Sequence, residues 1–141
     1  MSGRVRRLVA MTAIASLAVL VPMPSAAAGV HQGRFRGETE QARKISLRVN
    51  GKETVTFLRV VIEVPGPTGC VIEWDATEIA EPIKKDGTFV VRGEQNRDVL
   101  VVRGEFVSRR KAEGTAKTIM VGACEGRVKV AWTATRVVQA T

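Results

Sequence analysis

The chain has 141 residues, a formal net charge of +8, two cysteines, a single histidine and no tyrosine. A Ser–His nucleophilic pair needs a positioned base, and the lone His31 lies on a predicted terminal segment, which argues against that chemistry. Two cysteines and one distant histidine do not form a metal-ligand set, and no phosphate-binding glycine loop is present, so we expect no metal or other cofactor.

Residues 1–28 have the pattern of a secretory signal peptide. Three arginines precede the uncharged apolar run Leu8–Val21, and Pro22-Met23-Pro24 and the small residues Ser25–Ala28 follow it. The run is shorter than the roughly 20 residues that span a bilayer. We therefore predict a secreted protein, extracellular or periplasmic, with no transmembrane segment in its mature chain. The alternative is an apolar N-terminal helix of the folded domain.

The remaining chain, Gly29–Thr141, is predicted to form one domain. Removal of the three signal arginines leaves 19 basic and 14 acidic residues, a charge of +5 that favours anionic surfaces or serves as a solvated basic face. In an exported protein Cys70 and Cys124 predict a disulfide. It would close a loop of about 55 residues and contribute about 4 kcal/mol in the chain-entropy model.

Period-two alternation predicts strands through the first half of the domain. Asn50-Gly51 predicts a type I′ hairpin turn, and Pro65–Gly69 predicts a break. Pro82 limits the segment Glu78–Lys85 to irregular structure or a short edge strand. The strands expected here are Gly33–Glu40, Lys44–Val49, Thr54–Val64 and Cys70–Thr77, the last with Trp74 facing inward.

The second half centres on a hairpin of Thr88–Glu94 and Val99–Phe106, which both contain Val-Val-Arg-Gly-Glu. Gly93 and Gly104 fall on the apolar face, as does Gly37 of the first strand. Glycine weakens a strand interior, so we expect a bulge or a large side chain from the opposing sheet over each one, with Trp74 and Trp132 as candidates. Lys111–Gly114 is predicted to be a turn, followed by strands Thr115–Val121 and Val128–Thr135.

About seven to nine short strands with glycine-rich turns predict an all-β fold, either a two-sheet antiparallel β-sandwich or a small barrel. The sandwich is preferred, with the single disulfide tying its sheets together. This arrangement resembles immunoglobulin-type packing, but Trp74 follows Cys70 by four residues and the disulfide-to-Trp spacing differs, so no function is taken from that family.

The stretch Glu73-Trp74-Asp75-Ala76-Thr77-Glu78 resembles the Glu-X-Asp-X-X-Glu strand of laminarinase-type glucanases, which have a concanavalin-like β-sandwich. The resemblance implies Glu73 as nucleophile and Glu78 as acid/base of a minimal glycoside hydrolase. The alternative, which we favour, is that these carboxylates face solvent and pair with Arg or Lys.

A spaced pattern over most of the mature chain resembles small exported bacterial proteins of uncharacterised function. It comprises Gly33-X-Phe35-X-Gly37-X-Thr39, Cys70, Asp86-Gly87-Thr88-Phe89, Gly104-X-Phe106, Gly114-Thr115, Cys124 and Trp132-Thr133-Ala134. The resemblance implies a secreted β-sandwich and no catalytic assignment.

The sequence therefore favours a non-catalytic binding or structural module. Arg109, Arg110 and Lys111 form the densest basic cluster of the mature chain and are the predicted anion-binding residues. The expected partner is an acidic surface glycan or an envelope protein. Nucleic acid is disfavoured because every aromatic ring except Phe57 is predicted to face inward.

Overall fold

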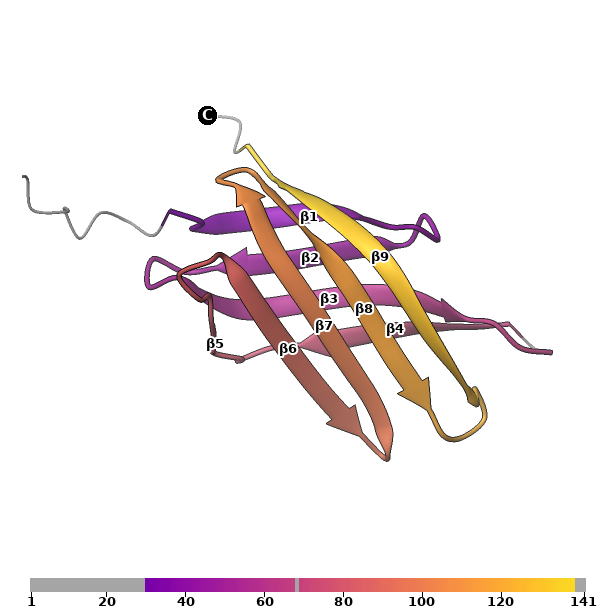
Figure 1. The fold of residues 1–141 in the computed structure, drawn as a ribbon. Helices are drawn as coiled ribbons and strands as arrows, with labels where there is room; N and C mark the ends of the chain where they lie inside the picture. Colours follow the sequence, from indigo (N-terminus) through magenta and orange to yellow (C-terminus); the bar gives the residue numbers. More distant parts are fainter. Residues whose placement is uncertain (1–29, 68, 139–141) are drawn as a thin grey trace, which may run out of the picture.

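A computed structural model describes residues 30–67 and 69–138, and the predicted signal peptide lies outside these residues. The fold is all-β (Figure 1). Within the described residues, no helix has the length and apolar character needed to cross a membrane. The strands are β1 (Gly33–Thr39), β2 (Lys44–Val49), β3 (Thr54–Val64), β4 (Cys70–Ala76), β5 (Glu81–Pro82), β6 (Thr88–Gln95), β7 (Asp98–Ser108), β8 (Lys111–Met120) and β9 (Gly126–Arg136).

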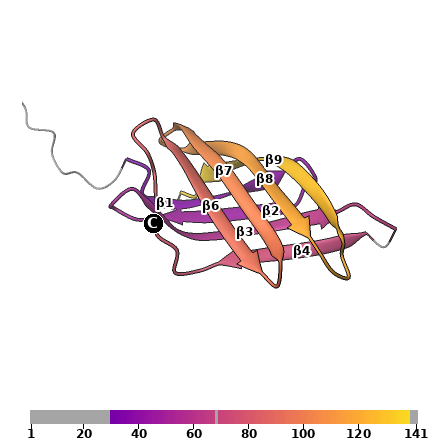
Figure 2. The same cartoon turned by 60° about the horizontal axis from the view of Figure 1, so that its bottom comes forward.

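The predicted two-sheet sandwich is wrong, because all the long strands belong to one sheet. Its order is β4-β3-β2-β1-β9-β8-β7-β6, and β5 adds to β3. The half formed by β6–β9 crosses over the half formed by β1–β4 (Figures 1 and 2). Strands β1 and β9 pair antiparallel from Phe35–Arg136 to Thr39–Trp132, and this ladder joins the halves into a nearly closed, barrel-like sheet.

Glycines stand on the inward face where neighbouring strands come closest. A β-carbon at Gly37 would lie 1.8 Å from the Thr133 carbonyl oxygen, and one at Gly114 would lie 1.9 Å from the Arg103 carbonyl oxygen. Only glycine allows backbones to approach this closely, and such approaches let the sheet coil tightly enough to close on itself. At Gly37 the predicted ring from an opposing sheet is therefore replaced by the backbone of the adjacent strand, and over Gly104 the ring is that of Phe89 on the adjacent strand β6.

Side chains complete the barrel where the hydrogen-bonded path ends. In the described chain β4 and β6 do not pair with each other. Instead, the ring of Trp74 on β4 covers Gly93 on β6. The indole Nε1 donates to Thr118 Oγ1 at 3.2 Å, and that buried hydroxyl donates to the Val99 carbonyl at 3.0 Å. Trp74 is thus confirmed as a filler over glycine. The core behind it is aliphatic and aromatic, and its largest fully buried side chains are Trp132, Phe35, Phe89, Ile45, Leu47 and Leu58.

Two turns differ from their predictions. Asn50-Gly51 is not a type I′ turn, because the positive φ falls on Glu53 (54°) and the β2–β3 register shifts at Arg48/Val49, which requires a longer loop. The pair of positive φ values typical of type I′ occurs instead at Asn96 (50°) and Arg97 (73°), where β6 meets β7.

The predicted turn at Lys111–Gly114 is also wrong, because these residues begin β8. Gly114 pairs directly with Gly104 of β7 in the middle of the ladder. A glycine that looked like a turn residue in the sequence is therefore a strand residue at a close contact between backbones.

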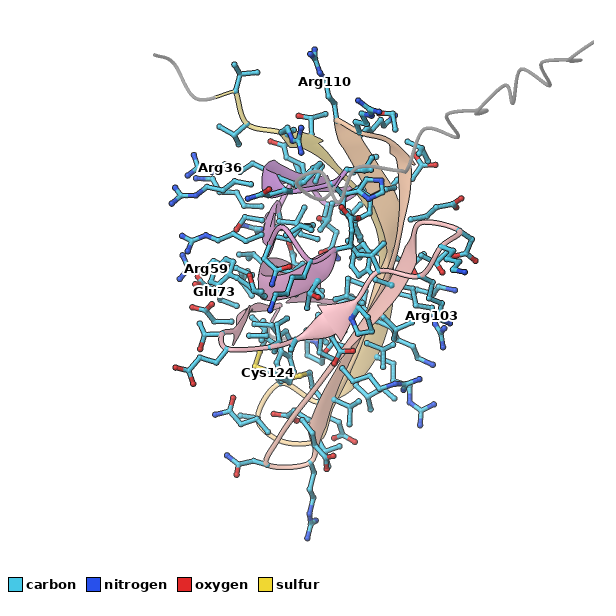
Figure 3. All side chains as sticks on the ribbon, turned by 90° about the vertical axis from the view of Figure 1, so that its left-hand side faces the viewer. Arg36, Arg59, Glu73, Arg103, Arg110 and Cys124 are labelled. Atoms are coloured by element: carbon cyan, nitrogen blue, oxygen red, sulfur yellow. A yellow bond between two sulfur atoms is a disulfide. The ribbon has the colours of Figure 1, made fainter. Side chains whose placement is uncertain are left out.

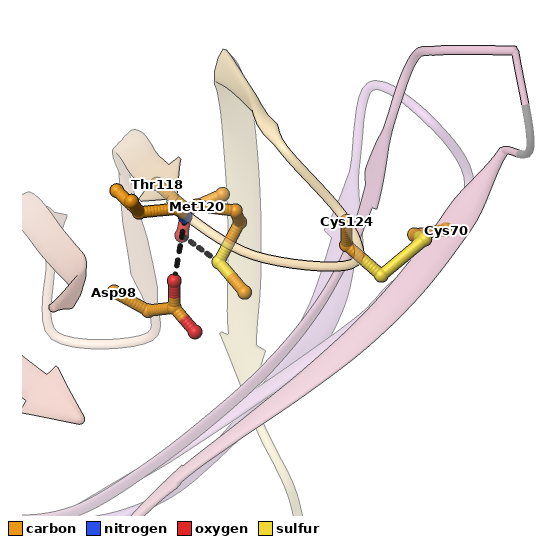
Figure 4. Close-up of a disulfide and its surroundings, with 6 residues drawn as sticks. Cys70, Asp98, Thr118, Met120 and Cys124 are labelled. Atoms are coloured by element: carbon orange, nitrogen blue, oxygen red, sulfur yellow. Dashed lines mark hydrogen bonds between the residues drawn. A yellow bond between two sulfur atoms is a disulfide. The ribbon is translucent and has the colours of Figure 1, made fainter. Parts of the chain in front are cut away.

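The predicted disulfide between Cys70 and Cys124 is confirmed. Cys70 opens β4, whereas Cys124 lies in the connection between β8 and β9 rather than in the last strand (Figure 4). The same connection is held by Asp98, whose carboxylate accepts the Val121 backbone N–H at 2.8 Å. The bridge therefore ties the edge strand β4 to the other half of the sheet.

His31 anchors the segment before β1. Its backbone N–H and ring Nδ1 contact the Glu53 carboxylate at 2.8 and 2.5 Å, and its ring centroid lies 4.4 Å from that of Phe106. The lead-in, expected from the sequence to be a mobile end, is therefore fixed against the body of the fold.

Candidate functional site

The outward faces of β1 and β2 bring arginines together. Arg34 and Arg36 alternate with inward residues on β1, and the antiparallel register places Arg34 directly opposite Arg48 of β2. All three side chains are exposed. Like charges directly opposite each other destabilise a sheet, so this pairing calls for an explanation other than stability.

These arginines line a cleft of about 620 Å³ at the end of the barrel where β1 begins. Its lining contains no aspartate or glutamate, and within the described residues none of the three forms an ion pair. We call this site the arginine cleft. Its lining residues are Gln32, Gly33, Arg34, Arg36, Arg48, Val49, Asn50, Thr56, Arg136 and Val137.

Arg136, at the end of β9, supplies the fourth cation and is held in place. Its Nη2 donates to the Gln32 carbonyl, its backbone N–H donates to the Arg110 carbonyl at 2.8 Å, and its guanidinium lies 5.8 Å from the centroid of the Phe35 ring. Its Nε is buried and has no hydrogen-bond partner in the described structure. An anion or a water molecule would satisfy this donor, because buried N–H groups are nearly always bonded.

Phe57 orders the side of the cleft next to β3. The Arg48 guanidinium lies 5.1 Å from the centroid of this ring and that of Arg59 lies 5.8 Å from it. A shallow hollow of about 130 Å³ continues from the cleft between these side chains. The outward position predicted for Phe57 is therefore correct, and the ring restricts Arg48 at a site where free rotation would weaken ligand binding.

Arg59 lies beyond the unpaired arginines of the cleft, and its own charge is balanced by acidic side chains. It contacts Asp75 at 2.8 Å through Nη2 and Glu73 at 3.2 Å through Nε. The hydrogen bond and the attraction from Asp75, with a smaller attraction from Glu73, raise the pKa of Arg59. Figure 3 shows Arg36, Arg59 and Glu73 on the same side of the molecule, so basic side chains give way to an acidic edge at β4.

The cluster predicted from the sequence is exposed: Arg109 and Arg110 form the β7–β8 turn, and Lys111 begins β8. It does not line the cleft, but the Arg110 carbonyl holds the Arg136 backbone. On the outward face Lys111 pairs with Thr135, which pairs with Arg36 two strand spacings, or about 10 Å, away. The turn therefore extends the basic surface of the arginine cleft.

The two carboxylates of the glycosidase hypothesis occupy different settings. Glu73 is on the outward face of β4 and pairs with Arg59, while Glu78 is exposed beyond the end of that strand with a positive φ of 56°. No hydrogen bond joins them within the described residues. The concanavalin-like sandwich implied by the resemblance is not the fold, and Glu73 has the Arg partner expected of a solvent-face carboxylate.

The part of the chain that the structure describes contains no group of potential metal ligands. No cluster of three or more His, Cys, Asp or Glu side chains occurs in it, and both cysteines form the disulfide.

Sequence reasoning missed Arg34, Arg36, Arg48 and Arg136 as a site. Alternation placed Arg34 and Arg36 on the outward face of the first predicted strand, which was the available signal. Their convergence depends on the β1–β2 register and on the pairing of β1 with β9, a strand almost 100 residues later.

No protein-family model matches this sequence, and no curated protein is significantly similar to it.

Proposed function

We propose that this protein is an exported, non-catalytic binding module that holds an acidic glycan in the arginine cleft. The observation that carries the proposal is the set of four arginines around one cleft of about 620 Å³ with no acidic residue in its lining. Guanidinium groups bind carboxylate, sulfate and phosphate through paired hydrogen bonds.

The spacing of the arginines suits a ligand with repeated negative charges. Arg34 and Arg36 are about 6.6 Å apart along β1, and Arg34 and Arg48 are about 5 Å apart across the ladder. Neighbouring acidic groups of a polymer would contact several guanidinium groups at once. A protein partner is less well supported, because interfaces between proteins centre on buried aromatic or aliphatic anchors and the apolar residues of the lining are only Val49 and Val137.

Export is part of the proposal and is supported by two observations. The pattern of residues 1–28 is typical of secretory signal peptides, and the Cys70–Cys124 disulfide is typical of oxidising compartments. Acidic wall and surface polymers are the polyanions accessible to such a protein.

Retention on immobilised polygalacturonate tests the proposal, with released sugars measured in the same incubation. We expect retention without release. We also expect Arg34→Gln/Arg48→Gln to weaken binding about tenfold or more, because hydrogen bonds to charged groups are worth about 1.5–3 kcal/mol each. The slope of log affinity against log salt should fall by up to about one per arginine removed.

Lys84→Gln/Lys85→Gln is the matched control, because it removes the same charge from exposed residues outside the cleft. Equal weakening by both double variants would indicate a response to net charge and would contradict a site in the cleft. The triple variant Arg109→Gln/Arg110→Gln/Lys111→Gln tests the cluster predicted from the sequence. Unchanged affinity and salt slope would remove that cluster from the binding surface.

The alternative function, a minimal glycoside hydrolase, makes the opposite prediction for the same incubation. It requires release of sugars that Glu73→Gln or Glu78→Gln abolishes. Glu73 lines a hollow of about 460 Å³, but Glu78 does not, and the Glu73 carboxylate is held in an ion pair by Arg59. This arrangement favours the binding module, because the two carboxylates do not face one shared cleft.

A further inference from the structure

A second uncompensated basic surface lies on the other half of the sheet. Lys117 of β8 and Lys129 of β9 are direct partners in the antiparallel ladder, which repeats the like-charge pairing of Arg34 with Arg48. Three arginines surround this pair on the outward faces of β6, β7 and β9. We call this surface the second basic face, and its members are Arg92, Arg103, Lys117, Arg127 and Lys129, all exposed.

Acidic residues do not neutralise the second basic face. None of its five cations forms an ion pair within residues 30–67 and 69–138. Carboxylates border the face without forming ion pairs with it: Arg103 lines a hollow with Glu105 and Glu113, and Arg92 lines another with Glu73, Asp75 and Glu94. The centre of the face is the Lys117–Lys129 pair, where the partner of Lys117 on β7 is the uncharged Val101.

The two basic surfaces point away from each other. Figure 3 shows Arg103 on the opposite side of the ribbon from Arg36 and Arg59. The packed core lies between the two halves, and packed layers of β-structure are separated by about 10 Å before outward side chains are added. This separation exceeds the Debye length of about 8 Å at physiological ionic strength, so an anion bound on one surface leaves the attraction of the other largely intact.

We propose that the second basic face binds a second acidic polysaccharide chain, so that one molecule bridges two chains. The proposal rests on the proposed function of the arginine cleft and adds a second, independent site. Charge complementarity selects the occupant: the half-buried Val101 lies between Arg92 and Lys117 and leaves a surface on which an extended chain can lie across the strands. The face carries no aromatic side chain of the kind that inserts into lipid, which favours a soluble polymer over a membrane.

A two-step capture experiment tests bridging. The purified protein is loaded on immobilised polygalacturonate, washed, and then exposed to fluorescent polygalacturonate in solution. We expect the wild-type protein to capture the second chain. Lys117→Gln/Lys129→Gln should remain on the immobilised polymer but capture about tenfold less of the soluble one. The control Lys44→Gln/Lys85→Gln removes two exposed charges outside both sites and should behave as wild type in both steps.

The outcomes separate the two proposals. Retention of the wild type without capture, or full capture by Lys117→Gln/Lys129→Gln, would overturn bridging and leave the arginine cleft standing. Arg34→Gln/Arg48→Gln should still be retained weakly through the second basic face, and its complete loss of retention would also overturn bridging. If retention depends on Lys117 and Lys129 but not on Arg34 and Arg48, the second face is the only site, and both proposals fail.

Discussion

The indole ring of Trp74 on β4 lies over Gly93 on β6, where a β-carbon would stand 3.8 Å from the ring. These two strands are the ends of the hydrogen-bonded path, so a side-chain contact replaces the missing ladder. The contact, together with the disulfide at the start of β4, holds an open sheet in a nearly closed form.

The first prediction concerns the inward-facing glycines, which differ in how much space an added β-carbon would have. At Gly93 a β-carbon would make ordinary contacts, so Gly93→Ala should keep or raise stability, by up to about 1 kcal/mol. At Gly114 it would lie 1.9 Å from a backbone oxygen that cannot move away, so Gly114→Ala should lower stability by about 1–3 kcal/mol or more. Urea unfolding of both variants measures the contrast, and equal effects would contradict the account of sheet coiling.

The second prediction concerns the opposed arginines of the cleft. Removing one of two like charges that face each other should relieve repulsion, so Arg34→Gln should raise the free energy of unfolding by about 0.2–1 kcal/mol while it weakens polyanion binding. Arg103→Gln is the control, because Arg103 pairs with the uncharged Thr115 and its removal relieves no such pair. Destabilisation by Arg34→Gln would indicate that the arginine supports the fold and is not kept for a ligand.

The third prediction concerns the disulfide. Cys70 and Cys124 are 54 residues apart in the sequence, and in the chain-entropy model a bridge over that distance stabilises by about 4 kcal/mol. Cys70→Ser/Cys124→Ser should therefore lose about that much in urea unfolding, and reduction of the wild type should give a similar loss. A much smaller change would show that the unfolded chain is already compact in this region.

Asp86 provides a prediction for pH. Its carboxylate accepts hydrogen bonds from the Thr88 hydroxyl at 2.6 Å and from the Thr88 backbone N–H at 3.0 Å, and these bonds, the hydroxyl first, lower the pKa of Asp86. A group with a lowered pKa in the folded state stabilises above its unfolded-state pKa, about 3.9 for aspartate. That stabilisation is lost as the pH falls through the lower, folded-state value.

NMR titration of the Asp86 carboxyl group checks this directly. Thr88→Val removes the hydroxyl donor and should raise the midpoint towards the ordinary aspartate value. Thr115→Val, which changes the same residue type on β8, should leave it in place. An Asp86 midpoint that does not respond to Thr88→Val would contradict the assignment to this hydrogen bond.

Alternation in the sequence was sufficient to predict which side chains are buried. Phe89, Val91, Leu100 and Val102 face the core as expected, and Thr54–Val64 has the predicted bounds. Alternation could not distinguish a sandwich from a barrel, because both bury one face of every strand. The deciding feature is the β1–β9 ladder. Its two strands are far apart in the sequence, and neither strand's sequence identifies the other as its partner.

The same limit applies to the candidate sites. Arg109, Arg110 and Lys111 were visible as a basic cluster because they are consecutive. The like-charge pairs Arg34–Arg48 and Lys117–Lys129 exist only in a particular register, and a shift of one residue would send each side chain to the other face. Local runs of charge can therefore be recognised in a sequence, whereas charges gathered by pairing cannot.

Both ends of the described chain, residues 30 and 138, lie beside the arginine cleft. The Val137 backbone N–H donates to the Arg34 carbonyl, and Gln32 accepts from Arg136, so residues 30 and 138 leave the barrel at this end. The Asn96-Arg97 turn between β6 and β7 is at the other end of the sheet (Figure 1). A bulky label fused next to residue 138 would therefore crowd the cleft, whereas a fluorophore or affinity peptide inserted at Asn96-Arg97 would leave access to it open.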